Sequence, residues 1–191
     1  MNTVIDRPRV DTTAPAATVF QIDPAASRIE FSIGKRLFFV KNLTVTGRFG
    51  DVAGTMTVDD QDPVSARVDV TIDAASIDTK NGRRDKHLRT ADFFDVDQHP
   101  TITFVSHRVE PIDRAEGRYR LLGDLTVRGV TREVALDTHD APVLGAGHDS
   151  RLALTLTTRL NRRDFGINWN NPLMNVADEL TVSLAVGLTR N

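Results

Sequence analysis

The chain has 191 residues, a net charge of −2 at pH 7, a hydrophobic content of 40% and a charged content of 26%. These proportions are typical of soluble globular proteins that are long enough to enclose a hydrophobic core. The nearly neutral balance gives no reason to expect nucleic acid or an anionic membrane as a partner. Because the sequence contains no cysteine, disulfides, thiolate metal sites and cysteine nucleophiles are excluded.

Residues 1–17 are polar and contain Pro8 and Pro15, a composition that favours a flexible N-terminal arm. We expect the remaining residues, 18–191, to form a single domain. Charged residues interrupt any apolar run in the arm, so it has no signal-peptide core. No stretch of the sequence has the length and apolarity of a transmembrane helix. We therefore expect a cytoplasmic protein without an integral membrane segment.

After the arm, hydrophobic side chains recur at every second position. The pattern is clear in RIEFSIG (28–34), ARVDVTIDA (66–74), RLALTLTTRL (151–160) and ELTVSLAVGL (179–188). Successive side chains of a strand point to opposite faces, so this alternation predicts half-buried antiparallel strands. Weaker versions of the pattern predict further strands over Leu43–Phe49, Asp51–Val58, Thr101–Val109, Tyr119–Val127 and Thr131–Thr138.

The predicted fold is therefore all-β, with about eight or nine strands joined mostly by short turns. Residues Arg83–Ala91 form the one segment that favours a helix, of about two turns. A sheet of this size must close on itself or pair with another sheet to protect its edges. An eight-stranded up-and-down barrel and a two-sheet sandwich both meet this requirement.

The segment Arg83–Phe104 combines many charged residues with two histidines, which suggests an acid–base site. His87 with Asp85, or His99 with Asp97, would be the pair, and the nearby hydroxyl nucleophiles would be Ser76, Thr90 and Thr101. The five histidines do not show the helical spacing of a zinc site, so no metal is expected.

A structural interpretation of the same segment competes with the catalytic one. On a short helix, Asp85 would lie near the N-terminus, and Arg89, four residues later, would pair with it. At least one of Phe93 and Phe94 should be buried as an anchor. Pro100 would then end the segment and begin the next strand. The segment would act as a helical plug against the barrel wall.

Several motifs resemble those of the YceI-like family, in the same order, from about Phe20 to Leu188. The segment RRDKHLRTADFFDVDQHPTITFVS (83–106) resembles the signature segment of the family. SIDTKNGRRD (76–85) stands where the family has its SIDT-type turn. GDLTVRGVTREVAL (123–136), LNRRDFGINW (160–169) and the opening FQIDPAASRIEFSIG (20–34) match further landmarks. The resemblance implies an extended, lipocalin-like antiparallel barrel of about eight strands with one short helix. It also implies a tunnel that holds a long isoprenoid chain or a similar amphiphile.

The apolar strand faces supply the expected tunnel wall, together with the single tryptophan. This wall comprises Ile29, Phe31, Ile33, Val68, Val70, Ile72, Ile102, Phe104, Leu121, Leu154, Leu156, Trp169, Val182 and Leu184. Alternation alone does not distinguish a hollow barrel from one filled by its own side chains. A buried lipid head group needs polar partners, and the candidates beside the barrel mouth are Arg84, Asp85, His87 and Arg89.

The first functional hypothesis is a binding and transport protein for a long-chain isoprenoid or quinone-like lipid, with no catalytic residue and no other cofactor. The second is an enzyme that acts on such a lipid through the His87, Asp85 and Arg89 group. The third is a packed structural or partner-binding domain without a ligand. A homodimer formed through an exposed strand edge is compatible with each hypothesis.

Overall fold

The computed structural model describes residues 17–37, 41–59, 61–139, 151–172 and 174–190. Residues 1–16 of the predicted arm lie outside the described residues, and Ala17 begins the first strand. The strands, in chain order, are β1 (Ala17–Leu37), β2 (Lys41–Phe49), β3 (Val52–Asp59), β4 (Asp62–Asp73), β5 (Ile77–Asp78), β6 (Thr101–Asp113), β7 (Arg118–Val127), β8 (Val130–Thr138), β9 (Arg151–Asn161) and β10 (Met174–Arg190). The helix α1 spans Gly82–Leu88, and short 3₁₀ turns span Ala74–Ser76 (η1) and Arg162–Phe165 (η2).

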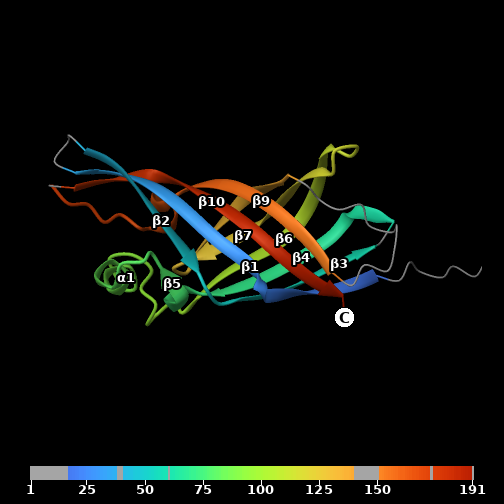
Figure 1. Ribbon diagram of the computed structural model, residues 1–191, viewed down its shortest axis with the longest axis horizontal. Coiled ribbons are helices and arrows are strands. Elements are labelled where there is room, and N and C mark those ends of the chain that lie inside the picture. Colours follow the sequence, from blue (N-terminus) through green and yellow to red (C-terminus); the bar gives the residue numbers. More distant parts are fainter. Residues whose placement is uncertain (1–16, 38–40, 60, 140–150, 173, 191) are drawn as a thin grey trace, which may run out of the picture.

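Eight antiparallel strands close into a barrel in the order β10-β9-β8-β7-β6-β4-β3-β1, and β1 returns to pair with β10 (Figure 1). The long β1 makes this closure because it serves three neighbours. Its first residues, 17–21, pair with β3, its later residues, 29–37, pair with β2, and both parts contact β10. β2 and β5 lie outside the closed barrel. The all-β barrel with one short helix is therefore confirmed, and the sandwich alternative is excluded.

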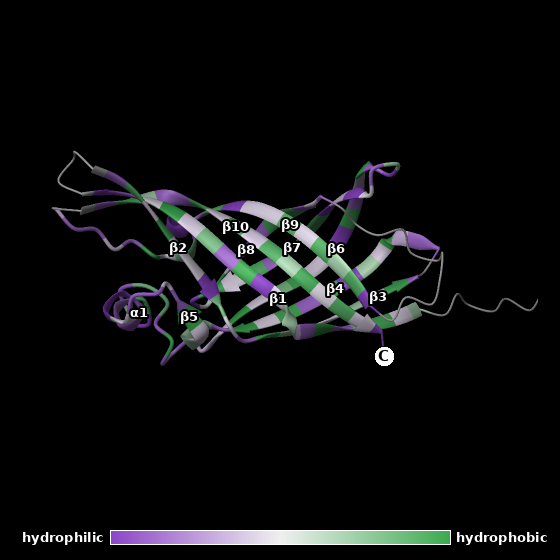
Figure 2. Ribbon diagram, viewed as in Figure 1, coloured by the Kyte–Doolittle hydropathy of each residue, from purple (hydrophilic) through white to green (hydrophobic). Residues whose placement is uncertain are grey.

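Hydrophobic and hydrophilic residues alternate along the strands, as the sequence predicts (Figure 2). The burial of the side chains of β4 follows the same alternation. Ala66 and Ile72 are buried, whereas Arg67 and Asp69 between them are exposed. Where β1 bends away from β10, after Asp23, the pairing register shifts. This break accommodates the proline that follows Asp23, since proline cannot donate to a strand ladder.

Among the described residues, the β8–β9 seam is the shortest join of the barrel, with the pairs Asp137–Thr157 and Thr138–Leu156 and one further backbone hydrogen bond from His139 to Thr155. The turn η2, which follows β9, packs against β8 and β10. Phe165 and Ile167 are both buried there. Gly166 adopts φ = 73°, a left-handed conformation that glycine allows, and so turns the chain back toward β10. The turn η2 therefore belongs to the cavity wall.

The helix α1 begins one residue before the expected position and ends three residues earlier than Ala91. Asn81 caps it by accepting a hydrogen bond from the Arg84 backbone N–H at 3.0 Å. The predicted pairing of Asp85 with Arg89 is wrong, since Asp85 accepts from Thr79 and Arg89 donates to backbone carbonyls. Phe93 and Phe94, of which at least one was expected to be buried as an anchor, are both half-buried and pack against the hydrophobic core.

Candidate functional site

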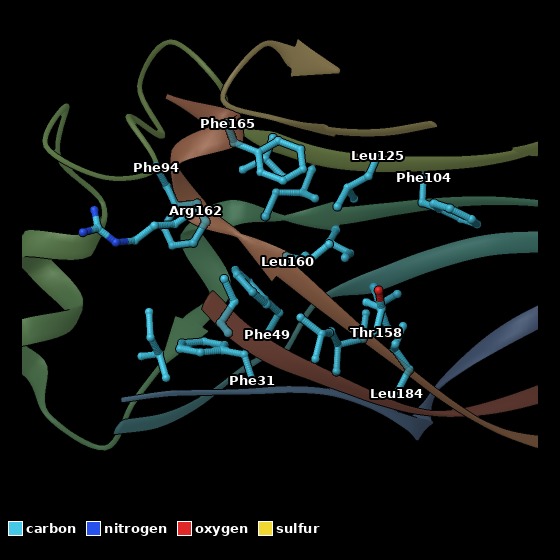
Figure 3. Close-up of a pocket in the computed structure, with 18 of the residues that line it drawn as sticks. Phe31, Phe49, Phe94, Phe104, Leu125, Thr158, Leu160, Arg162, Phe165 and Leu184 are labelled. Carbon is cyan, nitrogen blue, oxygen red and sulfur yellow. The ribbon is translucent and has the colours of Figure 1, made fainter. Parts of the chain in front are cut away.

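The barrel encloses an elongated cavity with a volume of about 910 Å³ (Figure 3). Its wall combines inward-facing side chains of most barrel strands with residues of α1, of the turns after α1 and of η2. All fourteen residues of the predicted tunnel wall line this single cavity. The strand faces were assigned from alternation, and barrel closure directs those faces toward a common interior.

The size of the cavity decides between a hollow and a filled interior. A barrel filled by its own side chains would leave few voids larger than a water molecule, so a cavity of about 910 Å³ indicates a hollow interior. Water would occupy it poorly, because most of the wall offers no hydrogen-bond partners. An apolar guest is the occupant that this interior accommodates best.

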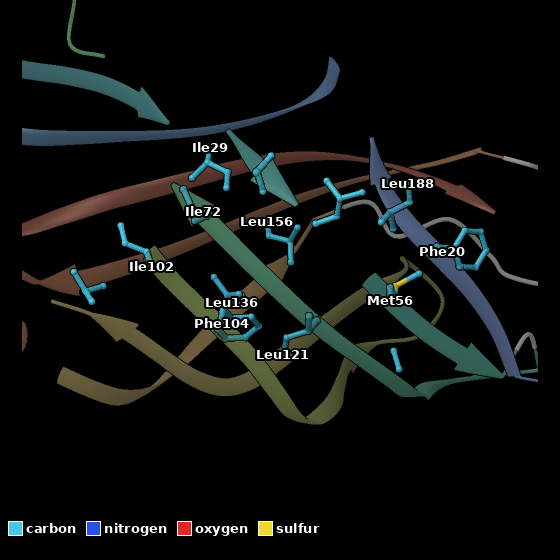
Figure 4. Packing of buried hydrophobic residues seen from close by; sticks show 14 of the residues in the cluster. Phe20, Ile29, Met56, Ile72, Ile102, Phe104, Leu121, Leu136, Leu156 and Leu188 are labelled. Atoms are coloured by element: carbon cyan, nitrogen blue, oxygen red, sulfur yellow. The ribbon is translucent and has the colours of Figure 1, made fainter. Parts of the chain in front are cut away.

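Buried apolar side chains of β1, β3 and β10 pack together at one end of the barrel (Figure 4). Phe20 lies opposite Met56 in the strand register, and Ile22 lies opposite Leu188. All four side chains are buried, and their contacts form a hydrophobic floor. A chain that enters the cavity therefore meets a mainly apolar surface at this end, where Ser27 and Thr55 are the polar lining residues.

The opposite end of the cavity lies beside α1, where the wall becomes polar. Asn81, Arg83, Lys86 and Thr90 line this end from α1 and its flanks, and Lys35 lines it from the end of β1. The cavity wall therefore changes from apolar side chains at one end to polar and charged side chains at the other.

Aromatic side chains join α1 and its following turns to the barrel at this polar end. The ring centroids of Phe49 and Phe94 are 5.7 Å apart in an edge-to-face arrangement. The ring of Trp169 lies 5.3 Å from Phe93 and 5.5 Å from His87. Such pairs stabilise by about 0.5–1.5 kcal/mol beyond their buried area. They hold the α1 segment against the segment that follows η2.

The four predicted head-group residues separate into two groups. Arg84 and His87 line the cavity, whereas Asp85 and Arg89 do not. Asp85 is buried and accepts hydrogen bonds from Thr79, from the backbone N–H at 3.0 Å and from the hydroxyl. Arg89 donates through Nε at 2.8 Å and through a terminal nitrogen at 2.9 Å to two carbonyls of the preceding segment. These two residues fasten α1 to the barrel.

The predicted acid–base pairs are not assembled by the fold. Nε2 of His87 lies 2.8 Å from Oδ2 of Asp92, an exposed carboxylate, and not beside Asp85. His99 packs against Gly129 at the β7–β8 turn and does not line the cavity. His87, Asp85 and Arg89 therefore do not converge on the cavity. Among the described residues, no group of three or more histidine, aspartate or glutamate side chains is placed to hold a metal ion.

Arg162 is a site residue that the sequence reasoning missed. It is 6% exposed, lines the cavity and donates to the carbonyls of Ile167, Trp169 and Ala177 at 2.6, 3.1 and 3.0 Å. Burial lowers the pKa of its guanidinium, and the attraction of Asp178 partly opposes that shift. Two adjacent arginines after a strand suggest solvent exposure. If the alternation of β9 is continued, however, Arg162 falls on the inner face and Arg163 on the outer face. This continuation was the signal in the sequence for a buried arginine.

None of the helices among the described residues is long and apolar enough to cross a membrane. Residues 20–188 match the YceI-like domain. The chain belongs to the YceI-like domain family. The family resemblance predicted from the motifs is thus confirmed over nearly the whole chain.

Curated relatives of this YceI-like chain include UPF0312 proteins of Shewanella and Vibrio species. A protein of Shewanella baltica strain OS185 is 38% identical over 127 residues, which are 64% of this chain and 64% of that protein. The match thus spans slightly less than two thirds of the Shewanella protein. A protein of Vibrio vulnificus strain YJ016 is 34% identical over 146 residues, 74% of this chain and 72% of that protein.

Solved structures with the same fold include a Campylobacter jejuni YceI protein, with a TM-score of 0.69 and 26% identity over 80% of this chain and 88% of that one. BcnA of Burkholderia cenocepacia has a TM-score of 0.72 and 19% identity, over 87% and 98% of the two chains. A domain of Saccharophagus degradans described as polyisoprenoid-binding has a TM-score of 0.64 and 16% identity, over 90% and 98%. The last two similarities show the fold alone.

Proposed function

We propose that this YceI-like protein binds and carries a long-chain isoprenoid, or a similar amphipathic lipid such as a quinone, inside its barrel. The observation that supports the proposal is the 910 Å³ cavity, which runs from a hydrophobic floor to a polar rim. Its volume lies near the upper end of the roughly 300–1,000 Å³ found for small-molecule sites. The polyisoprenoid-binding description of the Saccharophagus domain, which shares the fold, agrees with this ligand class.

Lipid binding in this cavity should cost little backbone conformational entropy. The wall is formed by strands of a closed barrel, so little backbone has to be ordered when the lipid enters. Each buried methylene of the guest contributes about 0.8 kcal/mol of hydrophobic free energy, and a long chain therefore binds more tightly than a short one. A protein that only holds and carries the lipid needs no nucleophilic side chain.

The test is native mass spectrometry of the purified protein, combined with uptake of added isoprenoid alcohols and quinones. Val70→Phe adds bulk inside the cavity, because Val70 lines it opposite Phe104. Val105→Phe is the matched control, since Val105 is 47% exposed on the outer face of β6. We expect uptake by the parent protein and the control, and reduced uptake of long chains by Val70→Phe. A parent protein that takes up neither ligand class would refute the proposal.

A further inference from the structure

The rows of inward-facing side chains continue past the end of the cavity that lies away from α1. On β1, Ile22 lines the cavity, whereas Phe20, two positions earlier on the same strand face, is buried but does not line it. On β3, Met56 lines the cavity, whereas Val58, two positions later, is buried but does not line it. The cavity therefore ends between these two pairs of residues, although both strands continue.

Two neighbouring strands show the same change. On β4, Val68 lines the cavity and the buried Ala66 does not. On β6, Phe104 lines the cavity and the buried Ser106 does not. The hydroxyl of Ser106 accepts a hydrogen bond from the backbone N–H of Val68 at 2.7 Å, so this polar group is satisfied within the barrel wall. Because these strands are adjacent in the order β6-β4-β3-β1, they fill one end of the barrel with their own side chains.

Phe20 is the largest of the four side chains that are buried beyond the cavity. It is 2% exposed, and it lies opposite Met56 of β3 in the strand register. Figure 4 shows the Phe20 ring beyond Met56 and Leu188, at the edge of the buried cluster. Thr18, two positions earlier on the same face of β1, is buried and accepts a hydrogen bond from Arg190 at 3.0 Å. The Phe20 ring thus separates the apolar cavity from a polar end of the barrel.

The shape of the barrel makes the position of this ring important for a long guest. An eight-stranded barrel has a narrow interior, so a linear isoprenoid has to lie along it. Each isoprene unit that enters buries apolar surface and adds to the affinity. Once the chain meets the Phe20 ring, a further unit finds no space inside and stays in water, where apolar surface is unfavourable.

We propose that Phe20 sets the greatest isoprenoid chain length that the cavity accepts. This inference rests on the proposed function, because it names the residue that selects among guests of the same class. A phenyl ring and an isoprene unit contain similar numbers of carbon atoms, so removal of the ring should extend the cavity by about one isoprene unit. A larger side chain at Ile22, one step nearer the cavity on the same face, should shorten it.

The experiment measures which chain lengths the protein extracts from phosphatidylcholine vesicles. The vesicles contain an equimolar mixture of farnesol, geranylgeraniol and longer linear polyprenols that differ by single isoprene units, and native mass spectrometry gives the occupancy of each length. Phe20→Ala removes the ring, and Ile22→Phe adds one inside the cavity. Val19→Ala and Val105→Phe are the matched controls, because Val19 and Val105 are 38% and 47% exposed on the outer faces of β1 and β6. Thermal unfolding checks that each variant is folded.

We expect occupancy of the parent protein to fall about tenfold or more at the first length beyond its limit, because one isoprene unit then leaves the bilayer for water. Phe20→Ala should raise the limit by about one unit, Ile22→Phe should lower it, and both controls should match the parent. If Phe20→Ala does not fold, Ile22→Phe alone decides the question.

Two results would overturn the inference and leave the carrier function intact: a parent protein with no upper limit of chain length, or a limit that is unchanged in a folded Phe20→Ala or Ile22→Phe variant. A parent protein that extracts no polyprenol of any length would overturn the inference together with isoprenoid carriage.

Discussion

A terminal nitrogen of the buried Arg162 lies 2.9 Å from Oδ1 of Asp178. Asp178 belongs to β10, and its side chain is 40% exposed. Arg163 reaches the same oxygen at 2.7 Å, but its own side chain is 49% exposed. One carboxylate thus joins an interior arginine and a surface arginine. Arg162 also holds the chain between η2 and β10 in place, because it donates hydrogen bonds to backbone carbonyls of that segment.

Replacing Arg162 with methionine should destabilise the protein by about 2–4 kcal/mol, because several carbonyls would lose a buried donor. The matched change Arg163→Met should cost less than about 1 kcal/mol, since it removes an exposed ion pair. Urea unfolding followed by circular dichroism measures both free energies. Equal losses in the two variants would show that Arg162 does not support the fold in this way.

Asp85 should matter more to stability than Asp92, which follows it by seven residues. Asp85→Ala leaves the buried backbone N–H of Thr79 without its acceptor and should cost about 1–3 kcal/mol. Asp92→Ala removes only an exposed contact with His87 and should change the free energy of unfolding by less than about 1 kcal/mol. Hydrogen exchange of the α1 amides, which should accelerate only in Asp85→Ala, would locate the effect at the helix. Unchanged protection there would contradict the anchoring role.

The strand faces were the most predictable part of the molecule. In the strands that contain Ile29 and Val182, hydrophobic residues recur at every second position, and this spacing fixes which side chains share a face. The role of Asp85 was harder to predict. A carboxylate three residues into a helix suits the helix dipole, a pair with Arg89 or a ligand. Only the fold shows Thr79 beside it. The sequence also did not predict whether the barrel is hollow, because an inward-facing residue such as Val70 has the same pattern in a packed core and in a cavity wall.

Trp169 should act as an intrinsic reporter of ligand binding. It is the only tryptophan, it lines the cavity, and its ring packs against the rings of both His87 and Phe93. A lipid that enters the cavity replaces water around the indole, so we expect the emission maximum to shift to shorter wavelength. Trp169→Phe should abolish the signal while native mass spectrometry still detects bound lipid. A titration with no change in the parent emission, under conditions where mass spectrometry shows full occupancy, would place the guest away from Trp169.

Asp78 should make folding sensitive to strong acid. Hydrogen bonds from Lys80 lower its pKa from 3.8 to about 2, and Arg48 adds attraction across the β2–β5 pair. The folded-state pKa lies below that of the unfolded chain. The carboxylate therefore stabilises the fold above about pH 3.9, and this contribution is lost as the pH falls through about 2. Thermal unfolding of the parent and of Asp78→Asn should differ at neutral pH and converge in that acidic window. Carbon NMR of the carboxyl group should give a midpoint near 2, which Lys80→Met should raise. A midpoint near 3.8 in the parent would show that the Lys80 contact does not persist in solution.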